Sequence, residues 1–245
     1  MPETLSEARE QGFRTDIVSF VRRSGRLNTR QQRAWDDHAD QFVLDVPRSI
    51  ARTSVDPAFV LDVVATFGRT APLVVEVGSG LGEAVVHAAE TAPERDFLAV
   101  EVYTPGLAQT VLRATQRGLT NLRLLQANAA EVLTTTLPEG SVDELWVFFP
   151  DPWHKARHHK RRLVTPELAE LAARAIRPGG TWRLATDWAE YADQMLEVVG
   201  ANPSFENVHG VGAVAPRFEG RVLTSFENKG HAAGRVITDL EFRRV

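Results

Sequence analysis

Short β-rich runs that alternate with helical segments constrain this chain more than any other feature. The β-rich runs lie at residues 73–77, 97–101, 122–126, 144–149 and 181–186. Segments with helical spacing of apolar residues separate them, at 82–90, 104–118, 128–137 and 165–176, the last closed by Arg-Pro-Gly-Gly. This alternation is typical of a parallel sheet joined by right-handed helical crossovers. We therefore predict a doubly wound α/β fold.

The flanks of this pattern complete the predicted architecture. The run that ends at Phe149 is apolar on both faces, as expected of a central buried strand. The last segments, 221–227 and 234–244, alternate like an antiparallel C-terminal hairpin at a sheet edge. Together these runs predict a mostly parallel seven-stranded sheet. Ahead of it, residues 56–68 predict a helix packed on the sheet, with Asp56 as N-cap, Pro57 at the first turn and Gly68 as the stop.

The N-terminal region differs in composition from the rest. Between Arg9 and Arg33 there are seven arginines against two acids, with little apolar periodicity. We interpret residues 1–50 as a basic, partly flexible arm and residues 51–245 as one domain. Within the arm, Arg22, Arg23 and Arg26 are candidates for phosphate contacts. A solvated tail is the commoner origin of such a charge run.

Composition excludes several other classes of protein. The chain of 245 residues contains no cysteine, which excludes a disulfide framework and a thiolate zinc site. No stretch approaches the ~18 consecutive apolar residues of a membrane span, and the first residues lack an apolar signal-peptide core. We therefore expect a cytoplasmic protein. The net charge of −4 shows no global excess of positive charge, so evidence for nucleic acid must come from its distribution.

A glycine turn with two acids predicts a cofactor site. Gly78, Gly80 and Gly82 follow the first β-rich run, where glycine lets backbone N–H groups approach a ligand. Position 83, which a dinucleotide fingerprint would fill with glycine, is Glu83, and no phosphate-binding GxxxxGK[ST] motif exists. Glu76 precedes the turn and Glu101 ends the next run, where a carboxylate can hold ribose hydroxyls. A ribosylated ligand without phosphate fits best, and S-adenosylmethionine is the obvious candidate. After the third run, the amide of Asn128 can pair with an adenine edge.

The stretch FFPDPWHKARHHKRR, residues 148–162, joins an acid to a basic run. Asp151 follows a buried strand and lies between two prolines, so we expect it on a stiff turn above the ligand crevice. The alternative is that this Pro-Asp-Pro-Trp sequence only forms the turn that ends the strand. Trp153 is equally suited to stacking on a base and to packing under the loop. Residues 154–162 hold five Lys or Arg and three His, which favours contacts with nucleic-acid phosphates over a metal site.

Several motifs together resemble one known family. EVGSGLG, AVEVY, NAAEVL, FFPDPWHKARHHKRR, ATDWAEY and TSFENKGH are similar to the bacterial tRNA (guanine-N7)-methyltransferases, which are class I S-adenosylmethionine-dependent methyltransferases with a Rossmann-like sheet. The resemblance runs from about residue 70 to the C-terminus, and FVRRSGRL resembles the family's N-terminus. It implies methylation of N7 of a guanosine in the variable loop of tRNA, giving 7-methylguanosine and S-adenosylhomocysteine.

The resemblance also implies site residues. The cofactor-binding residues would be Glu76, Gly78, Gly80, Glu101, Asn128 and Asp151, with Asp151 also catalytic. The substrate-binding residues would be Lys155, Asp187, Thr224, Ser225, Phe226 and Glu227. The RNA-binding segment would be Arg157, His158, His159, Lys160, Arg161 and Arg162. Two positions depart from the family, because Asn128 stands where members often have Asp and Ser225 where they often have Lys. The second departure leaves the role of Ser225 open.

The residues themselves leave alternatives. Guanine N7 keeps a lone pair at neutral pH, so Asp151 need not be a general base; it can orient the guanine or stabilise positive charge. Asp187 can instead N-cap the helix that follows it, and Glu227 can accept from guanine N1 and N2 or form a cross-strand salt bridge. A different methyl acceptor and an RNA-binding module without catalysis are the competing functions, while Glu83 disfavours an oxidoreductase. We expect tRNA as partner, a monomer or homodimer, and neither a metal, a membrane nor an obligatory protein partner.

Overall fold

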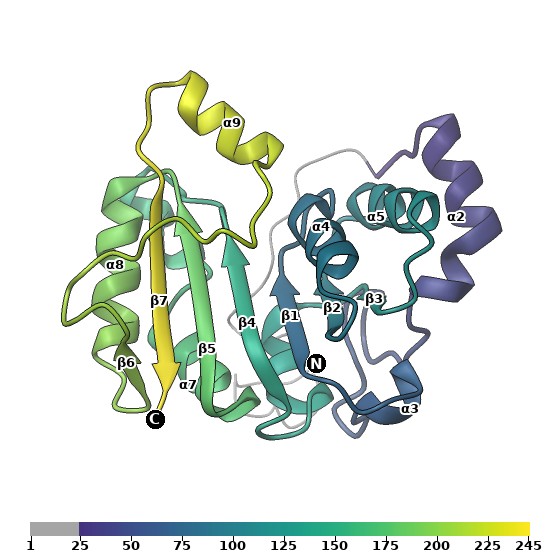
Figure 1. Ribbon diagram of the computed structural model, residues 1–245, viewed down its shortest axis with the longest axis horizontal. Coiled ribbons are helices and arrows are strands. Elements are labelled where there is room, and N and C mark those ends of the chain that lie inside the picture. Colours follow the sequence, from purple (N-terminus) through teal and green to yellow (C-terminus); the bar gives the residue numbers. More distant parts are fainter. Residues whose placement is uncertain (1–24) are drawn as a thin grey trace, which may run out of the picture.

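A seven-stranded sheet forms the centre of the protein (Figure 1). The computed structural model describes residues 25–245. The strands are ordered β3-β2-β1-β4-β5-β7-β6, with β1 to β5 parallel and β7 antiparallel to both of its neighbours. Their bounds are β1 Leu73–Val77, β2 Asp96–Val100, β3 Leu122–Leu125, β4 Val142–Phe148, β5 Ile176–Thr186, β6 Phe205–Asn207 and β7 Thr238–Arg244. The predicted doubly wound, mostly parallel α/β sheet is confirmed.

Helices cover both faces of this sheet. They are α2 Thr29–Phe42, α3 Val63–Phe67, α4 Glu83–Thr91, α5 Thr104–Gln116, α6 Ala129–Glu131, α7 Pro166–Ala175, α8 Ala189–Gly200 and α9 Ser225–Ala232. A π-helical turn, η1 Val132–Thr136, follows α6, and a 3₁₀-helix, η2 Ala156–Arg161, follows the predicted Asp151 turn. Figure 1 shows α4 and α5 in front of the sheet and α7 behind it. No helix within residues 25–245 is long and apolar enough to cross a membrane.

Alternating side chains divide the core between the two faces. On β4, Trp146 and Phe148 belong to the cluster that includes α4 and α5, whereas Leu145 and Val147 belong to the cluster with α7 and α8. Both sets are buried because successive strand residues point to opposite faces and both faces are covered. The prediction of β4 as a central buried strand is therefore confirmed.

The helix expected at 56–68 is shorter than predicted. Asp56 accepts a hydrogen bond from the N–H of Ala58 in a turn, and α3 begins only after Asp62, which accepts from the N–H of Ala65. Gly68 ends the helix in the left-handed conformation, as predicted. The error arose because both aspartates offer the same capping chemistry, and Asp56 preceded a favourable proline.

The C-terminal hairpin is a second correction. The sheet does end in antiparallel strands, but β7 pairs with β6 at the edge, not with residues 221–227. Thr224 instead caps α9 by accepting from the N–H of Glu227, and Figure 1 shows α9 above the carboxyl ends of β4 and β5. The Arg-Pro-Gly-Gly stretch, 177–180, lies inside β5 and does not close a helix.

Part of the predicted arm belongs to the fold. Asn28 and Gln31 form a capping box that starts α2, and Nε2 of Gln31 donates to the carbonyl of Pro105 at the start of α5. After α2, Val43 forms a parallel bridge to Leu124 of β3. Helix α2 therefore packs on α5 and the chain after it joins the edge of the sheet, while the candidate phosphate contacts Arg22 and Arg23 lie outside the described residues.

Candidate active site

A cavity of 1320 Å³ opens at the carboxyl ends of the central strands. Its lining comes from the glycine loop after β1, the residues after β2, the loop after β4, η2 and the start of α9. The chain runs outward in both directions from β1, whose neighbours are β2 and β4. This is the topological switch point, where ligands bind in open α/β sheets.

The glycine loop is held in a conformation that other residues rarely adopt. Gly78, Gly80 and Gly82 all have positive φ, of +73°, +57° and +72°. A Cβ at Gly106, in the first turn of α5, would collide with the carbonyl oxygen of Gly80. Helix α5 therefore rests directly on the loop, and the absence of side chains keeps one wall of the cavity as bare backbone.

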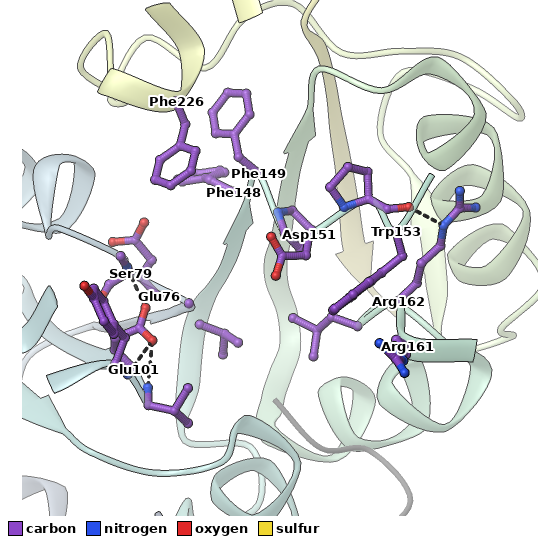
Figure 2. A pocket seen from close by; sticks show the side chains of 18 of the residues that line it. Glu76, Ser79, Glu101, Phe148, Phe149, Asp151, Trp153, Arg161, Arg162 and Phe226 are labelled. Atoms are coloured by element: carbon purple, nitrogen blue, oxygen red, sulfur yellow. Dashed lines mark hydrogen bonds between the residues drawn. The ribbon is translucent and has the colours of Figure 1, made fainter. Parts of the chain in front are cut away.

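Glu101 fastens this loop to the end of β2. Its carboxylate accepts backbone hydrogen bonds from Gly80 at 2.8 Å, from Val102 at 2.7 Å and from Tyr103 at 2.9 Å. The side chain still lines the cavity (Figure 2). Each carboxylate oxygen has two lone pairs, so Glu101 keeps capacity for hydroxyl donors from a ligand.

Glu76 presents an unsatisfied carboxylate to the cavity. Within residues 25–245, its Oε2 and the Oγ of the neighbouring Ser79 are buried without a hydrogen-bond partner. Burial raises the pKa of Glu76 to about 8, with a further contribution from the charge of Glu101 and opposition from Arg221. Buried polar atoms without partners are rare, and because Glu76 and Ser79 both line the cavity, these two atoms are candidates to bind a ligand.

Asp151 lies on a strained loop that faces these acids. The residues on either side of the Pro150-Asp151-Pro152 sequence, Phe149 and Trp153, have φ of +52° and +44°. Such values are costly for bulky residues and cluster at functional sites. Figure 2 shows the exposed Asp151 carboxylate pointing into the cavity toward Glu76 and Glu101.

Comparisons with known proteins show the family of this chain. Residues 70–240 match a family model described as "Putative methyltransferase". The chain is 52% identical to the tRNA (guanine-N(7)-)-methyltransferase of Paenarthrobacter aurescens, over 93% of this chain and 91% of that one. It is 42% identical to the protein of the same name from Aeromonas hydrophila subsp. hydrophila, over the full length of both. The chain belongs to the tRNA (guanine-N7)-methyltransferase family.

More distant proteins of known structure share the fold of this tRNA (guanine-N7)-methyltransferase family member. The 16S rRNA methyltransferase KamB has a TM-score of 0.55 at 19% identity, covering 76% of this chain and 95% of its own. The 16S rRNA (adenine(1408)-N(1))-methyltransferase of Catenulisporales acidiphilia has a TM-score of 0.52 at 18% identity, covering 79% and 93%. These matches confirm the predicted Rossmann-like methyltransferase fold.

The family's basic segment divides into exposed and buried parts. Lys155, Arg157 and Lys160 are exposed on or beside η2. Arg161 lies over the Trp153 ring, with its Cζ 5.0 Å from the ring centroid. His158 meets the same ring edge-on, so Trp153 packs within the basic segment while it lines the cavity. Trp153 therefore has the packing role, and stacking on a base stays a prediction.

Arg162 requires a correction to this segment, whereas His159 is half-buried. The side chain of Arg162 is 1% exposed. Its Nε donates to the carbonyl of Pro152 at 2.8 Å, and its Nη1 donates to Oε1 of Gln194 at 2.6 Å. The predicted RNA contact of Arg162 conflicts with this burial; the residue anchors the Asp151 loop instead. Nε2 of His159 is buried, 3.4 Å from a carboxylate oxygen of Glu190.

The family's substrate motif at 224–227 lies around the start of α9. Thr224 and Phe226 line the cavity. Ser225 donates to Glu83, and no sequence pattern marked Glu83 as a site residue. Glu227 is fully buried and accepts from Arg217 and Arg221, so its contacts are ion pairs within the protein.

The two remaining predicted residues lie beside the cavity. In the described chain, Asn128 and Asp187 are absent from its lining. Asn128 accepts from the N–H of Ala130 and caps α6. Asp187 pairs with Arg235 at 2.8 Å, and the alternative that it caps α8 is wrong because Trp188 holds that position without a side-chain bond. Residues 25–245 contain no cluster of His, Cys, Asp or Glu suited to a metal ion.

Proposed function

We propose that this protein transfers the methyl group of S-adenosylmethionine to N7 of a guanosine in the variable loop of tRNA. The products are 7-methylguanosine and S-adenosylhomocysteine. One observation carries the proposal: a single cavity joins the acids of the glycine loop to Asp151 and to a basic segment. The names of the relatives at 42% and 52% identity support the same acceptor.

The residues around the glycine loop fit S-adenosylmethionine. This ligand carries cationic groups and ribose hydroxyls but no phosphate. The unpartnered oxygens of Glu76 and Ser79 would accept from its amino group or hydroxyls, and Glu101 would accept from its ribose. Asn128, held at the start of α6, would lie next to the adenine. When bound, the ligand supplies an electrophilic methyl group on a sulfonium.

Asp151 would then hold the acceptor. Guanine N7 has a free lone pair, so the chain's task is alignment and electrostatic stabilisation and not proton removal. An exposed carboxylate at the cavity can accept from guanine N1–H and the exocyclic amino group, which only guanine among the common purines offers together. The strained loop and its anchor Arg162 limit the positions that Asp151 can take.

The basic segment would bind the tRNA backbone. Lys155, Lys160 and Arg161 line the cavity, and the exposed Arg157 lies on η2 between them. Phosphate contacts of this kind give affinity that falls with salt and position the RNA without reading sequence. With tRNA as substrate, we place the protein in the cytoplasm, as a monomer or homodimer without an obligatory protein partner.

The test is methyl transfer to an unmodified tRNA transcript with radiolabelled S-adenosylmethionine, followed by borohydride and aniline cleavage to locate 7-methylguanosine. We expect cleavage in the variable loop with the wild type, and its loss with Asp151→Ala. Asp193→Asn, at an exposed position of α8, is the matched control and should behave as wild type. No transfer to any tRNA despite cofactor binding would redirect the proposal to another acceptor. Normal turnover of Asp151→Asn would show that the carboxylate charge is dispensable.

A further inference from the structure

Arg221 is a charged side chain enclosed in the protein, close to the active site. It is 0% exposed. Its guanidinium donates to both oxygens of Asp239 on β7 and to both oxygens of Glu227 on α9. Arg217 completes the group, with bonds of 2.7 and 3.1 Å to Glu227. Two arginines and two carboxylates thus form a charge-balanced network, in which every buried charge is paired.

The open face of this network is occupied by aromatic rings. The Cζ of Arg221 lies 5.1 Å from the ring centroid of Phe148 and 5.4 Å from that of Phe149. Both distances are within the range of cation–π attraction, which strengthens where water is excluded. The last residue of β4 and the first residue of the Asp151 loop are therefore attached to the network through their side chains.

The network contacts the Asp151 loop through Phe149. Its φ of +52° is a conformation that persists only when the surroundings impose it. Its N–H donates to the carbonyl of Ala185 on β5, and its ring lies under Arg221. Backbone and ring are thus fixed separately, and the direction in which the chain leaves toward Asp151 is determined.

We propose that Arg221 is a positioning residue for methyl transfer, which fixes Phe149 and thereby aims Asp151 into the cavity. Glu227 then acts through Arg221 and not by touching the guanine. The proposal deepens the proposed function and rests on it. The same carboxylate cannot serve both roles, because Glu227 is fully buried and both of its oxygens accept from arginines.

Arg221→Lys tests the role because it keeps the charge but loses the planar fork that reaches two carboxylates. We expect kcat to fall at least tenfold, while the KM for tRNA and the cofactor Kd change less than threefold. Arg183→Lys is the matched control: Arg183 also lies over a ring, that of Phe218, and pairs with Glu144 and Glu241. It should lower Tm comparably and leave kcat unchanged. An unchanged kcat in Arg221→Lys would overturn the proposal.

A double-mutant cycle separates the two roles of Glu227. If Glu227 acts through Arg221, Glu227→Gln should lower kcat in the wild type but hardly further in Arg221→Lys. Losses that multiply would mean an independent role and would overturn the inference. Should Arg221→Lys fail to fold, Phe149→Leu addresses the same link from the other side, and a normal kcat there would equally refute it.

Hydrogen exchange provides a readout that does not depend on the acceptor. In Arg221→Lys, the amide of Phe149, which donates to the carbonyl of Ala185, should exchange at least tenfold faster, and in Arg183→Lys it should not. Unchanged exchange would overturn the positioning role even if the protein proved to methylate something other than tRNA. Faster exchange in Arg221→Lys, together with a wild type that does not methylate tRNA, would overturn only the proposed function and would leave the positioning role supported.

Discussion

Both hydrogen-bond donors of Ser225 meet one oxygen of Glu83: its backbone N–H lies 2.7 Å and its hydroxyl 2.8 Å from Oε2. Glu83 is the first residue of α4, directly after the glycine loop, and Ser225 is the first residue of α9. Arg113 donates to the other oxygen of Glu83 at 3.2 Å. These bonds of Glu83 to Ser225 and Arg113, which we call the clasp, hold the start of α9 over the cavity. Phe226 lies beside Gly80 there. The Ser225 position, which departs from the family's usual lysine, thus has a defined contact.

Removing the hydroxyl should loosen the clasp. We expect Ser225→Ala to lower the free energy of unfolding by about 1.5–3 kcal/mol at pH 7, the usual contribution of a hydrogen bond to a charged group. Cofactor Kd should rise several-fold because α9 covers the cavity less tightly. Denaturant unfolding and calorimetry measure the two effects. Ser141→Ala, whose hydroxyl bonds only to the nearby Pro138 carbonyl, is the control.

The clasp should also weaken in acid. Burial alone would raise the pKa of Glu83, but hydrogen bonds from Ser225 and the charge of Arg113 outweigh it and lower the pKa below 4.5. A depressed folded-state pKa gives stability that is present above the unfolded value and is lost as pH falls through the folded one. The difference between wild type and Ser225→Ala should therefore shrink as the pH falls below the ordinary value of 4.5. A constant difference would argue against an ionised Glu83 as acceptor.

Glu76 should make stability fall with rising pH. Its pKa is raised from 4.5 to about 8 by burial, so between these values the folded protein holds a proton that the unfolded chain releases. Glu76→Gln removes this penalty, and its advantage over wild type should grow by about 1 kcal/mol per pH unit in that window. Urea unfolding from pH 5 to 8 tests this, with the exposed Glu94→Gln as control. A pH-independent advantage would mean that Glu76 is already ionised.

Gly106 should not tolerate a side chain. A Cβ there would strike the carbonyl of Gly80, so we expect Gly106→Ala to cost about 1–3 kcal/mol and to weaken cofactor binding by moving the glycine loop. Gly200→Ala is the matched control, because Gly200 ends α8 with ordinary φ and open space around it. That change should be neutral or stabilise by up to about 1 kcal/mol. Thermal unfolding and calorimetry compare the pair, and equal effects would refute the close approach.

Arg162 and Arg157 should differ although they belong to one basic run. Arg162→Ala leaves the Pro152 carbonyl and Gln194 without their buried partner, so we expect a loss of about 2–4 kcal/mol in stability. Arg157→Ala should leave stability nearly unchanged and reduce the slope of log Kd for tRNA against log salt by about one. Denaturation and salt-dependent binding assays distinguish them. An unchanged salt slope in Arg157→Ala would remove Arg157 from the RNA surface.

Local pattern was sufficient to predict the frame of the site. The strand 73–77 and the glycine loop lie where the sequence predicts them. So do Glu76 before the loop, Glu101 after β2 and Asp151 after β4. Each of these depends on residues near one another in the chain: alternation along a strand, glycine at positive φ, proline beside an acid. The topology of parallel strands then brings their carboxyl ends together without further information.

Only the tertiary structure decided which charges bind ligands and which bind the protein. By sequence alone Arg162 resembles the exposed Arg157 of the same basic run, and Glu227 resembles an edge-strand acid. Both side chains are nevertheless buried in ion pairs and hydrogen bonds. Residue type does not reveal burial, because a charge becomes buried only where distant segments supply its partners. Ser225 and Glu83 are 142 positions apart. Arg221 lies in the loop before α9, whereas its partner Asp239 lies on β7. The sequence determined the glycine loop and the place of Asp151 after β4. The contacts of Arg221 with Glu227 of α9, Asp239 of β7 and the ring of Phe149 came from tertiary packing, because they join segments that no local pattern connects.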